Sequence, residues 1–225
     1  MVKVHAPRTG KSGEDHCPAA PLTSSRRHVY ELFVLGELMD RPLHGYLLQR
    51  ILSLVMGPFR QMSWGALYPL LRHLEQEELV EPDPATSDDG CDGGRPRKAY
   101  RITERGRRCF LVLMRQPSDF GPDTADLFRI KLAKFRHVEP GTRLGILRHH
   151  RAYLEAVRDH LAGALTYATT QSPIREGTRV WLQRLVDLRL HTTAAELAWV
   201  DREIATLRAS LPCEPAGEPD GPGPV

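Results

Sequence analysis

Basic side chains are concentrated in one short stretch of the chain, residues 95–108. That stretch carries seven lysines and arginines against a single acidic residue, Glu104, whereas residues 75–92 carry eight acidic residues and no basic one. A local cluster of positive charge attracts phosphate even when the whole chain is nearly neutral, and the net charge here is only +3. A solvated surface with charges of both signs is the simpler interpretation, and it stays open at this point.

A second set of polar side chains lies on a helix that the sequence predicts from the N-cap residue Ser63 to about Leu79. Its buried stripe is formed by leucines, and its exposed side offers Ser63, Trp64, Tyr68, Arg72 and His73. Hydroxyl groups suit phosphate oxygens, and an arginine reaches either a phosphate or a guanine edge. The start of the helix also presents free backbone N–H groups to a phosphate. The residue types therefore favour contact with nucleic acid.

Three alternatives stay open for these side chains. Tyr68 could belong to the core, Trp64 could pack against the preceding helix, and Arg72 could pair with Glu75 or Gln76 on its own helix.

The flanking elements suggest how these residues are positioned. Apolar spacing predicts helices over residues 28–39 and 43–55, before the helix that starts at Ser63. Short strands over 80–82 and 98–102 enclose a turn-rich loop, and Thr103 then caps a helix that runs to about Met114. Three helices followed by a hairpin are the layout of a winged helix-turn-helix, whose third helix enters the major groove. Arg95, Arg97 and Lys98 would lie on the hairpin, or wing.

The C-terminal half is predicted to be helical over residues 123–137, from Pro140 onward, and over 176–210. The last helix has an apolar face longer than a small core needs, so part of it is expected to bury against a second chain. Trp181 and Trp199 on this helix could line an effector pocket or pack at the dimer interface. His149, His150 and His160 could hold a metal, but a polar seam or an effector contact is the preferred interpretation.

Other parts of the sequence exclude several classes of protein. Residues 1–25 and 211–225 are poor in large apolar residues and are expected to be a disordered arm and tail. There is no apolar stretch for a transmembrane helix or a secretory signal, so the cytoplasm is the expected compartment and no membrane partner is expected. No catalytic, nucleotide-binding or metal-ligand motif occurs, so we expect neither an enzyme nor a cofactor or metal site.

Three segments, LHGY at 43–46, SWGALYPLLRHLE at 63–75 and GRPRKAYRITERG at 94–106, occur in an order that resembles the PadR family of bacterial transcriptional regulators. The resemblance covers about residues 28–115. It implies a homodimer that binds pseudo-palindromic operator DNA, usually represses, and is released by a small, often aromatic or phenolic, effector. It also implies the DNA contacts, which would come from His44, Tyr46, Ser63, Tyr68, Arg72, Arg95, Arg97 and Lys98.

The sequence departs from the family pattern at several positions. Ala66 replaces a common hydroxyl residue, and His73 replaces a common basic one. Glu78 stands where glycine often ends the third helix, so that end is expected to lack a left-handed cap. Pro69 inside the helix is shared with the family, and we expect a local bend there.

The sequence thus predicts a mainly α fold with a small β-hairpin wing. A winged helix-turn-helix domain would span residues 26–115, and a helical dimerisation and effector domain would span 120–210. The predicted function is that of a sequence-specific DNA-binding repressor that an effector releases. The alternative is a winged-helix protein-interaction module that has lost DNA binding.

Overall fold

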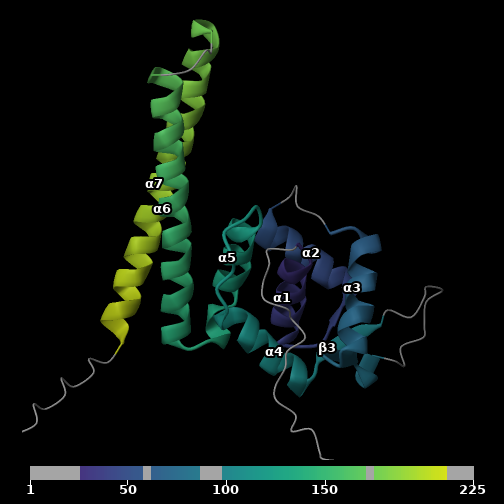
Figure 1. The fold of residues 1–225 in the computed structure, drawn as a ribbon. Coiled ribbons are helices and arrows are strands. Elements are labelled where there is room, and N and C mark those ends of the chain that lie inside the picture. The colour runs from purple at the N-terminus through teal and green to yellow at the C-terminus, as the bar shows by residue number, and fades with distance from the viewer. Residues whose placement is uncertain (1–25, 58–61, 87–97, 171–174, 212–225) are drawn as a thin grey trace, which may run out of the picture.

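The polypeptide forms a block of short helices with a small sheet, and two long helices stand beside this block, as the computed structural model shows (Figure 1). The structure describes residues 26–57, 62–86, 98–170 and 175–211. The expected N-terminal arm and all but the first residue of the expected tail lie outside these ranges. The element order is α1 (Arg26–Leu38), β1 (Leu43–His44), α2 (Gly45–Met56), α3 (Trp64–Gln76), β2 (Val80–Pro82), η1 (Pro84–Thr86), β3 (Ala99–Ile102), α4 (Glu104–Arg115), α5 (Thr124–Ala133), η2 (Phe135–His137), α6 (Pro140–Thr170) and α7 (Glu176–Ser210).

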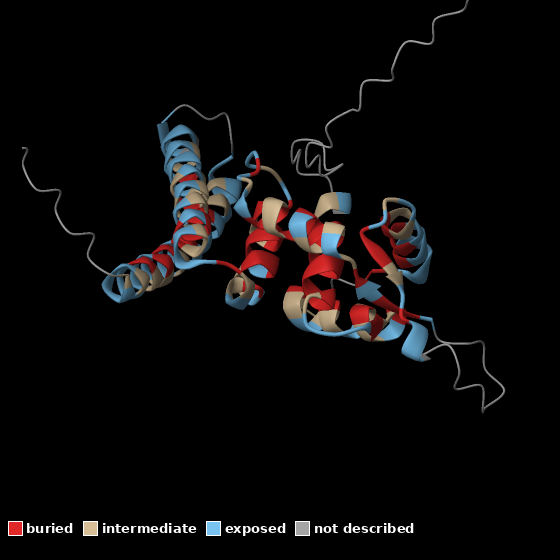
Figure 2. Cartoon of the chain, turned by 90° about the horizontal axis from the view of Figure 1, so that it is seen from below, coloured by how far each residue is buried: buried red, intermediate tan, exposed pale blue. Residues whose placement is uncertain are grey.

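Helix α1 is the centre of the block. Four consecutive residues, Leu32, Phe33, Val34 and Leu35, are each at most 1% exposed. A helix that buries its whole circumference needs neighbours on every side, and α1 contacts α2, α3, α4, α5 and β3. Figure 2 shows buried residues gathered in this block. The mainly helical winged fold is therefore confirmed.

The sheet has three antiparallel strands in the order β1-β3-β2, one more than the predicted hairpin. Val80 lies opposite Ile102 and Pro82 opposite Tyr100, as expected of a hairpin, while Leu43 pairs with Tyr100 on the other side of β3. The prediction that residue 43 starts a helix is therefore wrong by two residues. A strand of two residues is too short to leave an alternating pattern in the sequence.

The end of α3 corrects two predictions. The helix ends at Gln76 and not near Leu79, and Glu78 adopts the left-handed conformation with φ 57°. The Leu79 amide donates to the Leu74 carbonyl (2.8 Å) and the Glu78 amide to that of Glu75 (3.0 Å). These two bonds form a Schellman motif, which normally contains glycine at the left-handed position. The helix therefore has the left-handed cap that its sequence predicted to be missing.

Gly106 on α4 allows that helix to lie directly against the segment that leaves α3. A Cβ atom at this position would stand 2.0 Å from the Leu79 carbonyl oxygen and 2.8 Å from the Ile102 side chain. As predicted, Thr103 caps α4, because its hydroxyl oxygen accepts a hydrogen bond from the Gly106 amide at 3.0 Å. The segment that follows α3, the strand β3 and α4 thus meet at one close-packed point.

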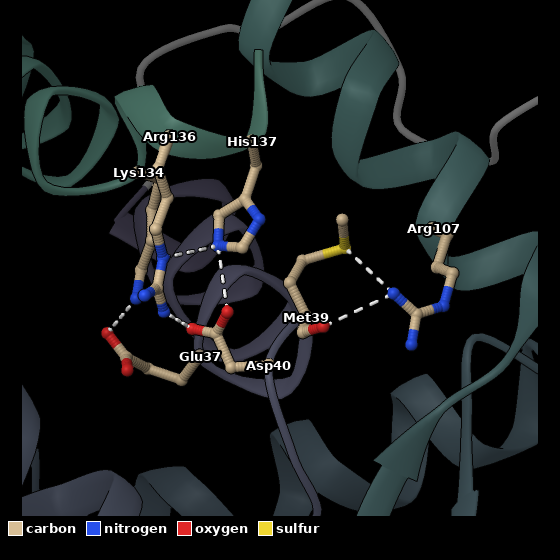
Figure 3. A network of polar contacts seen from close by, with 7 residues as sticks. All are labelled: Glu37, Met39, Asp40, Arg107, Lys134, Arg136 and His137. Atoms are coloured by element: carbon tan, nitrogen blue, oxygen red, sulfur yellow. Dashed lines mark hydrogen bonds and ion pairs between the residues drawn. The ribbon is translucent and has the colours of Figure 1, made fainter.

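Ion pairs, one of them buried, connect α1 to the segment that leads into the long helices (Figure 3). Lys134 pairs with Glu37 of α1 at 2.5 Å, and both side chains are at most 10% exposed. Arg136 pairs with Asp40, and His137 lies 3.3 Å from the same carboxylate. The expected helix over residues 123–137 is interrupted here, because α5 ends at Ala133 and the turn η2 carries the two partners of Asp40.

Helices α6 and α7 pack along each other as a long antiparallel hairpin (Figure 1). Pro140 starts α6, and α7 has the bounds that the sequence predicted. Of the 35 residues of α7, five are buried: Val186, Thr193, Leu197, Val200 and Ile204. Polar bonds supplement this narrow apolar seam, namely His150 to Glu196 (2.9 Å) and Arg151 to Asp201 (2.7 Å). None of the helices that the structure describes is both long and apolar enough to cross a membrane.

Candidate nucleic-acid interface

The outer face of α3 is a ridge of three exposed side chains, Trp64, Tyr68 and Arg72, which we call the α3 ridge. They are spaced four residues apart and therefore lie on one side of the helix. The opposite side is the leucine stripe, Leu67, Leu70, Leu71 and Leu74, and all four are buried as predicted. The helix is thus anchored by one face and presents the other to solvent.

Two of the open alternatives for the α3 ridge are settled by its geometry. Tyr68 is 53% exposed and so is not a core residue. Trp64 is 41% exposed and stacks on Tyr68, with ring centroids 5.6 Å apart. The rim of its indole also approaches Gly45 at the start of α2, where a Cβ atom would lie 3.8 Å away. Trp64 therefore lies beside the start of α2 but leaves much of its surface accessible.

Arg72 does not pair with Glu75 on its own helix. The Glu75 carboxylate instead accepts two hydrogen bonds from Nζ of Lys98, at 2.8 and 3.0 Å. Arg72 is exposed and makes no ion pair with any residue that the structure describes. Its guanidinium group is therefore available for an external anion.

Lys98 connects the base of the wing to α3. Besides the Glu75 pair, its ammonium group lies 5.0 Å from the centroid of the Tyr100 ring. The hydrogen bond to Glu75 raises the Lys98 pKa, so the group stays charged. This charge is largely compensated by Glu75, an arrangement that charge counting along the sequence did not predict.

The two opposite charge runs of the sequence in fact face each other across the hairpin. Arg101 pairs with Glu81 at 2.8 Å, as the register of β2 on β3 requires, and Arg105 lies 3.6 Å from Glu78. Arg107 is turned inward and donates to the Met39 carbonyl oxygen at 3.2 Å (Figure 3). Several basic residues of the 95–108 cluster thus already have partners within the fold. The wing residues Arg95 and Arg97 lie outside the described residues.

The start of α3 offers backbone donors. Ser63 occupies the N-cap position as predicted, but its exposed hydroxyl makes no capping bond. Its carbonyl oxygen accepts from the Ala66 and Leu67 amides, so the preceding N–H groups have no partner within the helix. The hydroxyl and these amides can together bind an anion.

The remaining predicted contact residues occupy different places. Tyr46, at the start of α2, is 55% exposed, whereas His44 is half-buried on β1. His73 points away from the α3 ridge toward α1, with its Nε2 3.8 Å from the Glu31 carboxylate. The structure therefore brings Tyr46 to the surface but places His73 between two helices.

The two tryptophans that the sequence offered for an effector do not share a pocket. Trp181 is 67% exposed and carries the Arg184 guanidinium 5.0 Å from its ring centroid. Trp199 is partly buried and packs edge-on against Phe128 of α5 at 6.5 Å. Eighteen residues of α7 separate them, which corresponds to ~27 Å along the helix axis.

A cavity of about 330 Å³ lies between the end of α4, α5 and α6, and the sequence did not predict it. Its wall includes Leu127, Phe128, Lys131, Ile146, His149 and His150. Burial lowers the Lys131 pKa to about 8, and its Nζ donates to the Gln116 carbonyl oxygen at 2.7 Å. A lysine beside Leu127, Phe128 and Ile130 on the buried face of α5 is the signal that could have pointed to this cavity.

No group of three or more metal-ligating side chains occurs among the residues that the structure describes. His150 instead bonds to Glu196, which agrees with the preferred interpretation of these histidines as a polar seam.

A search of curated proteins found no match. Solved structures that match the chain include Bacillus subtilis PadR in complex with operator DNA (16% identity, TM-score 0.37, covering 79% of this chain and 97% of that chain) and the PadR-like transcriptional regulator BC1756 from Bacillus cereus (22%, 0.33, 81% and 99%). Bacillus subtilis PadR in complex with p-coumaric acid is a third (16%, 0.35, 80% and 99%). The model of the transcriptional regulator PadR-like family matches residues 34–111, the segment from α1 to α4 that carries the α3 ridge and the sheet. Through this segment the chain resembles the transcriptional regulator PadR-like family.

Proposed function

We propose that the chain is a homodimeric, sequence-specific DNA-binding repressor that a small effector releases from its operator in the cytoplasm. The observation that carries this proposal is the α3 ridge, an exposed Trp64, Tyr68 and Arg72 on a helix anchored by four buried leucines. A helix of this kind fits the major groove, where an arginine can bind a guanine edge or a phosphate. Ser63 and the α3 N-terminus would bind a neighbouring phosphate.

The proposed interface extends beyond α3. His44 and Tyr46 would contact the DNA backbone at the start of α2, and Arg95, Arg97 and Lys98 would do so from the wing. His73 would contribute only at the edge of the interface, because its side chain lies next to Glu31.

A gel shift on the DNA upstream of the protein's own gene tests the proposal. We expect Arg72→Ala to weaken binding by ~1–3 kcal/mol, which is about fivefold to 150-fold. Arg202→Ala, an exposed arginine on α7, is the matched control and should bind like the wild type. Equal affinity of both variants would argue against α3 as the recognition helix.

The apolar residues at the far end of α7 support the dimer. Trp181, Leu185 and Leu188 are 67%, 53% and 60% exposed and share one side of the helix. Burial against a second copy would remove this area from water. We expect Leu185→Asp to produce monomers in sedimentation measurements. Leu54→Asp, at a leucine of α2 that is 78% exposed, should leave association unchanged.

The cavity between α4, α5 and α6 is the proposed effector site, in preference to Trp181 and Trp199. It adjoins both the winged block and the long helices, so a ligand there could change how the two are arranged. Gly145 lines the cavity with open space at its Cβ position. We expect Gly145→Phe to retain DNA binding and to resist any compound that releases the wild type.

The alternative, a protein-interaction module that has lost DNA binding, is favoured by one observation. Lys98, Arg101 and Arg105 are each paired with an acidic side chain, which reduces the positive potential of the hairpin. Salt dependence separates the two functions, because DNA binding weakens steeply as added salt reduces the gain from counterion release. Absence of any shift at low salt would favour the interaction module.

A further inference from the structure

Lys131 is a buried lysine for which the fold provides no counter-ion. Its side chain is 5% exposed, and it makes no ion pair with any residue that the structure describes. Its Nζ donates to the Gln116 carbonyl oxygen at 2.7 Å, and both residues line the cavity between α4, α5 and α6. None of the described residues that line this cavity is acidic. The amine therefore lies at the cavity wall without a carboxylate beside it.

The other lysines that the structure describes are paired. Lys134 is as deeply buried as Lys131, but its Nζ lies 2.5 Å from the Glu37 carboxylate. Lys98 is exposed, and its Nζ donates to Glu75. A buried ammonium group is normally retained only with such a partner, because desolvation penalises its charge. Lys131 is thus the described lysine whose surroundings favour the neutral amine.

The ionisable groups around Lys131 reinforce this preference. Those that line the same cavity are Arg115 at the end of α4, and His149 and His150 of α6. Burial, and after it the Lys131 charge, lower the His149 pKa, so a second positive charge at this wall is disfavoured. Burial lowers the Lys131 pKa to about 8. A desolvated, neutral lysine amine has a free lone pair and is a nucleophile.

The rest of the wall determines which electrophile can reach this amine. The cavity has a volume of about 330 Å³, and Leu127, Phe128 and Ile146 make much of its surface apolar. Such a cavity admits a small apolar molecule. An aldehyde carbonyl reacts with a lysine amine without prior activation and forms a Schiff base. The neutral product has no charge to desolvate, so its formation removes the cost of the buried ammonium group.

We infer that the buried, unpaired amine of Lys131 is a covalent site for a small apolar aldehyde, which it binds as an imine. The lone pair of Nζ forms a bond to the carbonyl carbon. The two amine protons leave with the carbonyl oxygen as water, and a C=N bond remains. The reaction is reversible and needs no oxidant or reductant. This inference goes beyond the proposed effector site, because it assigns covalent chemistry to one atom, and it depends on neither DNA binding nor the dimer.

Trapping with hexanal and sodium cyanoborohydride, followed by peptide mass spectrometry of the full chain, tests the inference. Cyanoborohydride reduces an imine to a stable secondary amine, so the label on each lysine can be measured. At about pH 7.5 we expect Lys131 to be labelled at least about tenfold faster than Lys98 and Lys134, because far more of it is neutral. Its rate should level off above pH ~8, whereas that of Lys98 should continue to rise.

Two controls separate the cavity from general amine reactivity. The α-amino group, whose usual pKa is also about 8, reports reactivity at a similar pKa outside the cavity. Relative to this group, Lys131 should prefer hexanal over the polar glyceraldehyde by at least about threefold, because the cavity wall is apolar. Unfolding in urea should abolish both the fast labelling of Lys131 and this preference.

A pair of matched variants tests whether the aldehyde enters through the cavity. Gly145 lines the cavity, Gly163 on the same helix does not, and both have open space at the Cβ position. Gly145→Phe should slow Lys131 labelling at least about tenfold. Gly163→Phe should leave the labelling rate unchanged.

Three results would each overturn the inference: wild-type Lys131 labelled no faster than Lys98, a Lys131 rate that does not level off with pH, or unchanged labelling in folded Gly145→Phe. The first two need no variant, so they decide the outcome even if Gly145→Phe does not fold. No arm contains DNA, so failure here is distinct from failure of the proposed DNA binding.

Discussion

The winged block and the α6–α7 hairpin are both helical, but they are stabilised in different ways. In the block, α1 is buried on all sides and close contacts such as that of Gly106 leave no free space. In the hairpin, α7 buries five of its 35 residues, and its far end exposes a tryptophan and two leucines. The block contains its own core, whereas the hairpin leaves apolar surface uncovered by any residue that the structure describes. Matched substitutions in the two regions make this difference measurable.

The largest effect is expected for Gly106→Ala in the block. The new Cβ would meet the Leu79 carbonyl oxygen at 2.0 Å, so α4 must move away from the end of α3. We expect a loss of at least ~4 kcal/mol in the free energy of unfolding. Gly163→Ala in α6 has no atom within 4 Å of the new methyl group and should gain about 1 kcal/mol from helix propensity. Thermal unfolding followed by circular dichroism compares the two, and similar melting temperatures would contradict the packing argument.

Breaking one ion pair in each region is the next comparison. Lys134→Met leaves the Glu37 carboxylate buried and unpaired, and should cost ~3–5 kcal/mol. Arg151→Met removes solvent-exposed pairs with Glu155 of α6 and Asp201 of α7, and should leave the free energy of unfolding nearly unchanged. The double variant Glu37→Leu with Lys134→Met should recover much of the loss, because no charge then remains buried. Urea denaturation gives all three values. An equal cost for the two single variants would show that the buried ion pair contributes no more to the free energy of unfolding than the exposed ones.

Lys131, at the junction of the two regions, should give stability a distinctive pH dependence. Its pKa falls from 10.5 to about 8 on folding, because burial penalises the charged form. Between these values the unfolded chain binds the proton and the folded chain does not, so the free energy of unfolding rises with pH over this window. Relative to Lys131→Met, the wild type should gain up to ~3 kcal/mol. Below this window the wild type carries the full cost of the buried charge.

Chemical denaturation across this pH range measures the effect. Lys98→Met is the control, because Lys98 is exposed and its pKa is raised rather than lowered. The difference in free energy of unfolding between the wild type and Lys98→Met should not change in favour of the wild type as the pH rises through the window. A flat difference for Lys131→Met would mean that its ammonium group is not desolvated in solution.

The smallest effect is expected where a side chain occupies a backbone conformation that suits glycine. Glu78 has φ 57°, so Glu78→Gly should stabilise the block by about 1 kcal/mol. Its neighbour Glu77 has φ −82°, and Glu77→Gly should give no gain. The ion pair between Glu78 and Arg105 is exposed, so its removal subtracts little from this gain. Equal melting temperatures of Glu78→Gly and the wild type would show that the strain is relieved elsewhere.

The parts of the fold that the sequence predicted are the helices with a regular apolar pattern. Leucines at helical spacing identified the buried side of α3, and the long apolar pattern gave the bounds of α7. The strand β1 was missed because it depends on pairing with β3, a distant segment. The left-handed Glu78 was missed because this position of a Schellman motif normally holds glycine. The α3 ridge was predictable because it is the complement of a buried stripe on one helix.

The cavity was not predictable in this way. Its polar wall includes Gln116, His149 and His150, which belong to segments more than 30 residues apart. The histidines could be recognised as a polar group on one helix, but not the loop and the lysine that they meet. Likewise, the ion pairs of Lys98 and Arg101 follow from strand register, which charge counting does not include.

The short strand β1 has a mechanical consequence. It connects the entry of α2 to one edge of β3, while β2, which follows α3, occupies the other edge. Helices α2 and α3 and the strands of the hairpin are therefore joined through one common strand, β3, and should move together. Under the proposed DNA binding, we expect the domain to meet a bent duplex by a change in the tilt of the whole sheet with its helices, and not by a shift of β2 and β3 relative to α2.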